Sequence, residues 1–101
     1  MIDLNKVADE CYNTAYKREL NGANINVNTM AMLKHCATEV IEATESYASV
    51  DISAEQFEKE LADIICCALI IASRNDINIE KALSDVMEKN RLRAEGKGDK
   101  P

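Results

Sequence analysis

Residues 61–72 read LADIICCALIIA, and this run decides the fold. Apolar side chains would occupy every face of a helix over these residues, so we predict a helix that is buried on all sides. Asp63 is the only polar side chain in the run. An ionised carboxylate in apolar surroundings costs several kcal/mol unless a partner or a metal compensates its charge. Asp63 is therefore the first candidate for a functional residue.

Three further carboxylates extend this observation. Glu60 precedes Asp63 by three residues, and Glu39 and Glu42 have the same spacing upstream. Residues three apart on a helix share a face, with Cβ atoms roughly 5–6 Å apart. Oxygen ligands of this kind are those that Mg²⁺ prefers in proteins. We predict that all four carboxylates bind Mg²⁺, with Mn²⁺ as a possible substitute.

Other metals are less well matched by this composition. His35 is the only histidine, whereas a di-iron bundle uses Glu-x-x-His pairs. The four cysteines (Cys11, Cys36, Cys66 and Cys67) lack the C-x-x-C spacing of a zinc site. We interpret them as small buried apolar side chains that stay reduced. Free thiols of this kind are typical of a reducing compartment, so we expect a cytoplasmic protein.

Composition favours an all-α fold. Three Gly and one Pro leave little turn chemistry for a β-sandwich or barrel. The apolar periodicity predicts helices over residues 4–20, from 28 or 29 to 48, from a Ser53 cap to 74, and over 79–94, with Asp3 and Asn78 as further N-caps. We predict one four-helix domain over residues 1–95 and a mobile tail over 96–101. Because one such unit cannot cover the third helix, we expect a homo-oligomer, either a dimer or a tetramer.

Charge restricts the classes of partner. The net charge of −6 argues against binding to a nucleic acid polymer or a membrane surface, and the apolar run is too short to span a membrane. The last thirteen residues nevertheless hold five basic and two acidic side chains. An acidic body with a basic C-terminal strip would hold a metal and an anionic ligand side by side. The alternative is that these cations only complement a helix dipole.

The two acidic pairs also resemble a known signature. Glu39-Val-Ile-Glu42, a gap of seventeen residues and Glu60-Leu-Ala-Asp63 are similar to the metal-binding motifs of the MazG-like all-α nucleoside triphosphate pyrophosphohydrolases. The closing stretch EKNRLR, residues 88–93, is similar to the last helix of that family. The resemblance covers residues 28–97.

The resemblance implies hydrolysis of (d)NTPs to the monophosphate and pyrophosphate. Glu39, Glu42, Glu60 and Asp63 would bind Mg²⁺, and Glu39 or Glu42 would serve as the general base. The triphosphate would contact Lys89 and Arg93, with Asn90, Arg91 and Lys97 as further candidates.

Two departures from the family pattern leave other points open. Thr38 stands where members often have another glutamate, and the chain has no tryptophan to stack on a base, so the preferred base is open. A catalytically silent helical interaction module on the same scaffold is the alternative function. A phosphoribosyl-ATP pyrophosphohydrolase is ranked lower, because Ile64 to Cys67 replace the Tyr-His pair of those relatives.

Overall fold

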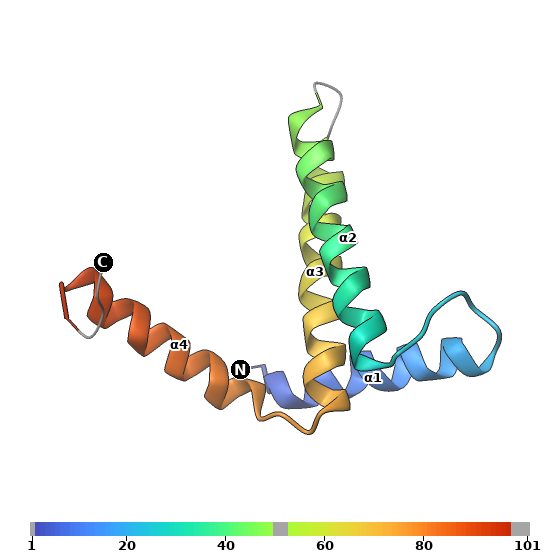
Figure 1. Ribbon diagram of the computed structural model, residues 1–101, viewed down its shortest axis with the longest axis horizontal. Helices are drawn as coiled ribbons and strands as arrows, with labels where there is room; N and C mark the ends of the chain where they lie inside the picture. The colour runs from blue at the N-terminus through green and yellow to red at the C-terminus, as the bar shows by residue number, and fades with distance from the viewer. Residues whose placement is uncertain (1, 50–52, 98–101) are drawn as a thin grey trace.

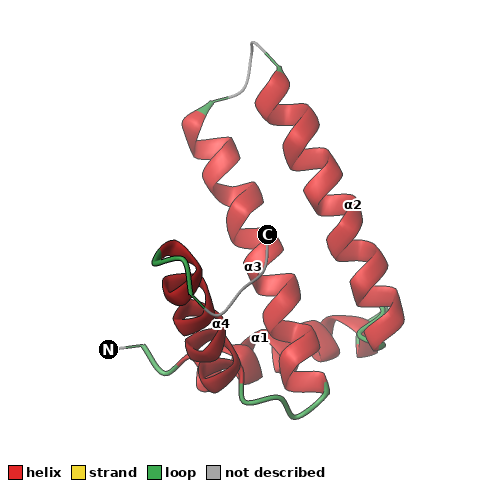
Figure 2. Cartoon of the chain, turned by 60° about the vertical axis from the view of Figure 1, so that its left-hand side comes forward, coloured by secondary structure: helices red, strands yellow, loops and turns green. Residues whose placement is uncertain are grey.

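The computed structural model describes residues 2–49 and 53–97, which form four α-helices and no strand. The helices are α1 (Leu4–Leu20), α2 (Thr29–Ala48), α3 (Ala54–Arg74) and α4 (Ile79–Ala94). Figure 1 shows their arrangement, and Figure 2 shows the same chain from another side. The prediction of an all-α chain of four helices is confirmed.

Each helix begins where a short polar side chain caps it. The N-cap side chains of Asp3, Asn28, Ser53 and Asn78 accept hydrogen bonds from backbone N–H groups of the first turn, at 3.0–3.1 Å. The first turn of a helix has N–H groups without intrahelical partners, and these caps satisfy some of them. The predicted helix starts follow from this local chemistry.

The core lies where α1 crosses the lower part of the α2–α3 pair. The helices α2 and α3 run antiparallel and side by side, and α1 packs against α3 near its C-terminal end (Figure 1). A buried cluster joins the three helices and the loop before α2; its members are Ala15, Val27, Met32, Cys67 and Ile70. The side chains of this cluster fix α2 against α3 along the face that carries the acidic pairs.

Polar contacts, and not a core, attach α4 to the remainder. The backbone N–H of Leu4 donates to Glu80 Oε1 at 2.6 Å, and the N–H of Ile79 donates to Asn5 Oδ1 at 2.9 Å. The N-termini of α1 and α4 thus cap each other. No residue of α4 is buried, and the helix points away from the α2–α3 pair (Figure 1).

The single chain is therefore open and does not close into a bundle. Its radius of gyration is 16.1 Å, whereas a compact domain of this length has about 13 Å. Its accessible surface is 7620 Å², against about 5,700 Å² for a compact monomer of this mass. The difference, about 1,900 Å², is of the size that subunit interfaces bury. The homo-oligomer stays a prediction, and this open shape is a reason to expect it.

One prediction about residues 61–72 is wrong for the single chain. Four residues in the second half of the run are buried, namely Cys67, Leu69, Ile70 and Ala72. Leu61 and Ile65, however, are 45% and 60% exposed, and Asp63 is exposed. The reason is that α2 and α1 cover only one side of α3, and α4 does not cover the other. Asp63 thus has access to solvent unless a second chain covers this side.

Candidate functional site

The structure brings the four predicted carboxylates together in one pocket. Glu39 and Glu42 come from α2, Glu60 and Asp63 come from α3, and Thr38 and His35 complete the lining. The pocket has a volume of about 130 Å³. One water molecule occupies about 30 Å³ in the liquid, so the pocket has room for an ion with several of its water molecules. The two acidic motifs face each other because α2 and α3 are antiparallel neighbours.

Two carboxylate oxygens of residues that line this pocket are buried and have no hydrogen-bond partner among the described residues. Glu39 Oε2 and Glu60 Oε1 are buried without a hydrogen bond, and both residues are partly buried. Buried polar atoms in folded proteins almost always have a partner, and a buried carboxylate oxygen without one is costly. A hard divalent cation is the partner that such oxygens fit best, since Mg²⁺ takes oxygen ligands and retains several waters.

His35 holds the other oxygen of Glu39. The Nε2 atom of His35 lies 2.5 Å from Glu39 Oε1, across one turn of α2. This contact restrains the Glu39 carboxylate, as hydrogen-bond partners of the ligands do around protein metal sites, while the second oxygen of Glu39 is buried. Our sequence interpretation did not assign His35 this role. The signal was present, because residues four apart on a helix are neighbours.

The site is not assembled in ligating geometry. Within residues 2–49 and 53–97, no group of three or more His, Cys, Asp or Glu side chains is close enough to hold a metal together. Glu42 and Asp63 are exposed at the edge of the pocket, whereas Glu39 and Glu60 lie deeper. The donor set therefore fits a hard cation in the type of its ligand atoms, whereas the side chains are not close enough together to hold an ion in this conformation.

Two cysteines of α3, Cys66 and Cys67, lie near enough to this site for the charge of Glu39 to act on their thiols. Burial, the Cys11 thiol and the charges of Asp63 and Glu39 raise the pKa of Cys66 to about 11. Burial and the neighbouring Cys36 raise the pKa of Cys67 to about 12. These thiols stay protonated at neutral pH, whereas a zinc ligand needs a thiolate.

The residues predicted to contact phosphates lie elsewhere. All four are exposed and belong to α4 or its C-terminal turn; they are Lys89, Asn90, Arg93 and Lys97. None of them lines the carboxylate pocket, and α4 does not pack against α2. Within one chain, the structure therefore separates the basic strip from the acidic pocket.

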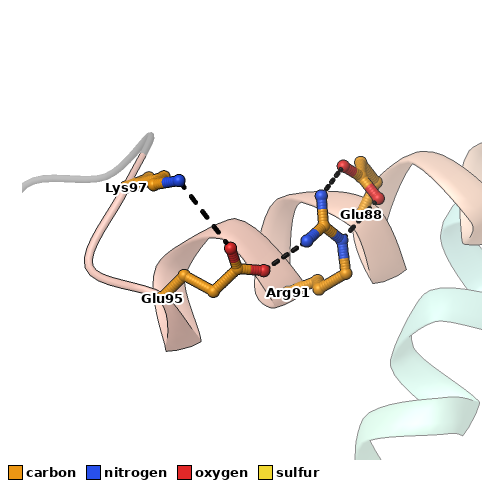
Figure 3. Close-up of polar contacts among 4 residues, drawn as sticks. All are labelled: Glu88, Arg91, Glu95 and Lys97. Carbon is orange, nitrogen blue, oxygen red and sulfur yellow. Dashed lines mark hydrogen bonds and ion pairs between the residues drawn. The ribbon is translucent and has the colours of Figure 1, made fainter.

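Ion pairs along α4 orient part of the basic strip. Figure 3 shows Arg91 between Glu88, at 2.6 Å, and Glu95. Lys97 Nζ lies 3.9 Å from Glu95 Oε1. The pairing with Glu88 raises the pKa of Arg91, and the same contact lowers the pKa of Glu88. Arg91 is thus engaged within its own helix.

The C-terminal cap of α4 includes the first two residues of the predicted tail, 96 and 97. Gly96 has φ +76°, and the N–H groups of Gly96 and Lys97 donate to the carbonyls of Arg93 and Leu92, at 2.9 and 2.7 Å. This is a Schellman motif, in which a left-handed glycine ends the helix. Residues 96 and 97 are therefore part of the helix cap, and the remaining predicted tail residues, 98–101, lie outside the described residues.

Residues 26–96 match the family model of the MazG nucleotide pyrophosphohydrolase domain. The chain belongs to the MazG nucleotide pyrophosphohydrolase family. The match begins just before α2 and ends just after α4, so it contains both acidic motifs and the part of the basic strip up to residue 96, with Lys89, Arg91 and Arg93. A search of curated proteins and a search of solved structures found no match.

The MazG domain accounts for three of the four helices. Helix α1 lies before the matched residues, yet it supplies Ala15 to the buried cluster and carries the caps that attach α4. No helix within the described residues has the length and apolarity that crossing a membrane requires.

Proposed function

We propose that this chain is a Mg²⁺-dependent nucleoside triphosphate pyrophosphohydrolase, which converts a (d)NTP to the (d)NMP and pyrophosphate. Membership of the MazG family supports the reaction class. The single observation that carries the proposal is the pocket lined by four carboxylates of α2 and α3, two of whose oxygens are buried without a hydrogen-bond partner in the part of the chain that the structure describes.

The carboxylates would hold Mg²⁺, or Mn²⁺ in its place. Glu39 and Glu60 offer the two buried oxygens, and Glu42 and Asp63 close the pocket from its exposed edge. When bound, the ion supplies charge neutralisation at the phosphates and lowers the pKa of a coordinated water. The protein supplies position, because the packing of α2 on α3 fixes the four Cα positions.

Glu42 is our choice for the general base. Glu39 has one oxygen held by His35, and its other oxygen is buried, whereas the Glu42 carboxylate makes no hydrogen bond to any described residue. The Glu42 carboxylate would take a proton from the attacking water, whose oxygen forms the new bond to phosphorus. The α–β bridging bond breaks, and pyrophosphate leaves with the electron pair. A carboxylate at the exposed edge can pass the proton to solvent.

The phosphates would be bound by a second copy of the chain. Lys89, Asn90, Arg93 and Lys97 lie away from the carboxylate pocket of their own chain, and α4 has an exposed apolar face that includes Leu83, 46% exposed. Residues 1–88 hold sixteen acidic and seven basic side chains, while the last thirteen hold five basic and two acidic. This complementarity favours α4 of one chain against the α2–α3 pair of another, where Lys and Arg suit phosphate oxygens.

The test uses the purified full chain with a panel of ribo- and deoxyribonucleoside triphosphates. Products are identified by ³¹P NMR in Mg²⁺, in Mn²⁺ and in excess chelator. We expect monophosphate and pyrophosphate in equal amounts, only with a divalent ion. Release of orthophosphate, or equal turnover in chelator, would contradict the proposed reaction. No turnover of any nucleotide would favour the catalytically silent module.

A further inference from the structure

A second pocket adjoins the carboxylate pocket and has no assigned role. It lies between the end of α1, the connecting loop and the first turns of α2, and its volume is about 410 Å³. His35 lines both pockets, so the two share a wall. Arg18 and Ile25 also line a third hollow, against Cys66 of α3, so the second pocket continues along α1.

The sizes of the two pockets suit different parts of one ligand. The carboxylate pocket, at about 130 Å³, is too small for an organic ligand, because small-molecule pockets have volumes of about 300–1,000 Å³. The second pocket falls in that range. Because His35 lines both pockets, a nucleotide with its phosphates at the carboxylates can extend past His35 into the second pocket.

The lining has the chemistry that recognises a base and its sugar. Asn24 and Asn26 bring amide groups, and Arg18 and His35 bring planar groups, while Met32 and Ile25 provide apolar surface. Amide and guanidinium groups form hydrogen bonds with base edges, and His rings and Arg planes stack on bases. Stacking on Arg18 or His35 would replace the tryptophan that this chain lacks.

Two of these side chains are available for a ligand. Arg18 forms no ion pair, and Asn24 no side-chain hydrogen bond, with any residue in the described ranges 2–49 and 53–97. Asn26 differs, because its Oδ1 accepts from the backbone N–H of Asn28 at 2.9 Å and so shapes the entry to α2. Arg18 and Asn24 are therefore the residues that a ligand would engage at least structural cost.

We propose that this second pocket, between the α1–α2 loop and His35, binds the nucleoside part of the substrate, and that Arg18 and Asn24 contact it. The inference rests on the proposed function, because it orients the nucleotide from the carboxylate pocket. It gives the chain a specificity-determining region outside the two acidic motifs. Residues 18–24 of this region also lie outside the matched MazG domain.

Binding measurements separate this proposal from the chemistry. The probes are a nucleoside triphosphate analogue with a methylene group between the α- and β-phosphates, and inorganic tripolyphosphate, each titrated into the full chain with Mg²⁺ by calorimetry. The variants are Asn24→Ala and Arg18→Gln, and Asn13→Ala on the exposed surface of α1 is the matched control. Circular dichroism verifies that each variant is folded.

We expect each pocket variant to bind the nucleotide analogue about 5–10-fold more weakly, the effect of one lost hydrogen bond. The affinity for tripolyphosphate should not change. The control should change neither. The proposal is overturned if the affinities for both probes fall equally, if neither affinity changes, or if the wild type binds the analogue no better than tripolyphosphate. If the wild type shows the predicted binding pattern but releases no pyrophosphate from any nucleotide, the proposed function fails and the nucleoside pocket stands.

Discussion

The α2–α3 pair carries the carboxylates of the proposed site, and α4 carries its basic strip. The two parts are built in opposite ways. The pair packs on a buried cluster and gathers four carboxylates in one pocket. Helix α4 buries no residue, meets only the start of α1 closely, and carries the basic strip. Packing therefore fixes the acidic half within one chain, while the basic half is presented outward. From this difference we propose that a complete site combines the acidic half of one chain with the basic half of another.

The largest expected effect concerns the acidic half. Glu42→Gln keeps the size of the side chain but removes the proton acceptor, so we expect turnover to fall by about 10²–10⁴-fold. The measurement is the initial rate of pyrophosphate release at saturating Mg²⁺. Glu45→Gln, one turn further on α2 and outside the pocket, is the control. Equal rates for Glu42→Gln and Glu45→Gln would remove Glu42 from the mechanism.

A packing comparison follows. Ile70 is 6% exposed in the core, whereas Leu83 of α4 is 46% exposed. We expect Ile70→Ala to lower the free energy of unfolding by about 2–5 kcal/mol. Leu83→Ala should cost less and should shift the protein to smaller assemblies, because its apolar face would lie at the interface between copies. Denaturant melts and light scattering after size exclusion measure the two effects. A wild type that is monomeric at micromolar concentration would contradict this picture.

Metal should stabilise the acidic half specifically. A ligand at one hundred times its Kd stabilises the folded state by about 2.7 kcal/mol. We expect Mg²⁺ to raise the Tm of the wild type and to leave Glu60→Gln nearly unchanged. In chelator we expect Glu60→Gln to be more stable than the wild type, by about 1 kcal/mol in the free energy of unfolding. The reason is that a neutral amide replaces a charged carboxylate whose Oε1 is buried without a partner among the described residues. Equal shifts by Mg²⁺ in both proteins would place the ion elsewhere.

The basic half should affect substrate binding in trans. Lys89→Gln should lower kcat/KM by about 10–100-fold, as expected when a charged phosphate contact is lost. The control is Lys81→Gln, where the lysine pairs with Asp85 at 2.9 Å.

Mixing Lys89→Gln with Asp63→Asn provides the sharper arm of this test. In an exchanging dimer, complementary chains restore about a quarter of the wild-type sites if α4 acts across the interface. No recovery in a mixture that is shown to exchange would place α4 at the site of its own chain.

The smallest expected effect concerns the thiols of Cys66 and Cys67, near the carboxylate pocket. In the folded chain the pKa values of Cys66 and Cys67 are raised to about 11 and about 12, from 9.0. The unfolded chain therefore releases these protons at lower pH than the folded chain does. The contribution of these two thiols to the free energy of unfolding should be constant below pH 9 and should fall as the pH rises through 11. A double Cys66→Ala, Cys67→Ala variant should lose that slope in melts recorded between pH 8 and 11.

Local chemistry predicted most of the fold and the acidic site from the sequence. The caps at Asp3, Ser53 and Asn78 gave the helix starts, and the spacing of Glu39 to Asp63 gave the faces that meet. The exposure of Asp63 was not predictable, because an apolar run does not state whether its own chain or another covers it. The separation of the basic strip depends on how α4 leaves α3, which is set by contacts with α1. His35 was missed because it lies outside the two acidic motifs, although its partner Glu39 is a motif residue four positions further along the same helix.

The most direct test of the central claim is a Mn²⁺ titration of the metal-free chain, followed by the electron paramagnetic resonance of the unbound ion. We predict saturable binding to the wild type, binding at least about tenfold weaker in Glu60→Gln and in Asp63→Asn, and unchanged binding in Lys89→Gln. Equal Mn²⁺ affinity in all four proteins, or no binding to the wild type, would contradict the claim that the α2–α3 pair is the metal centre.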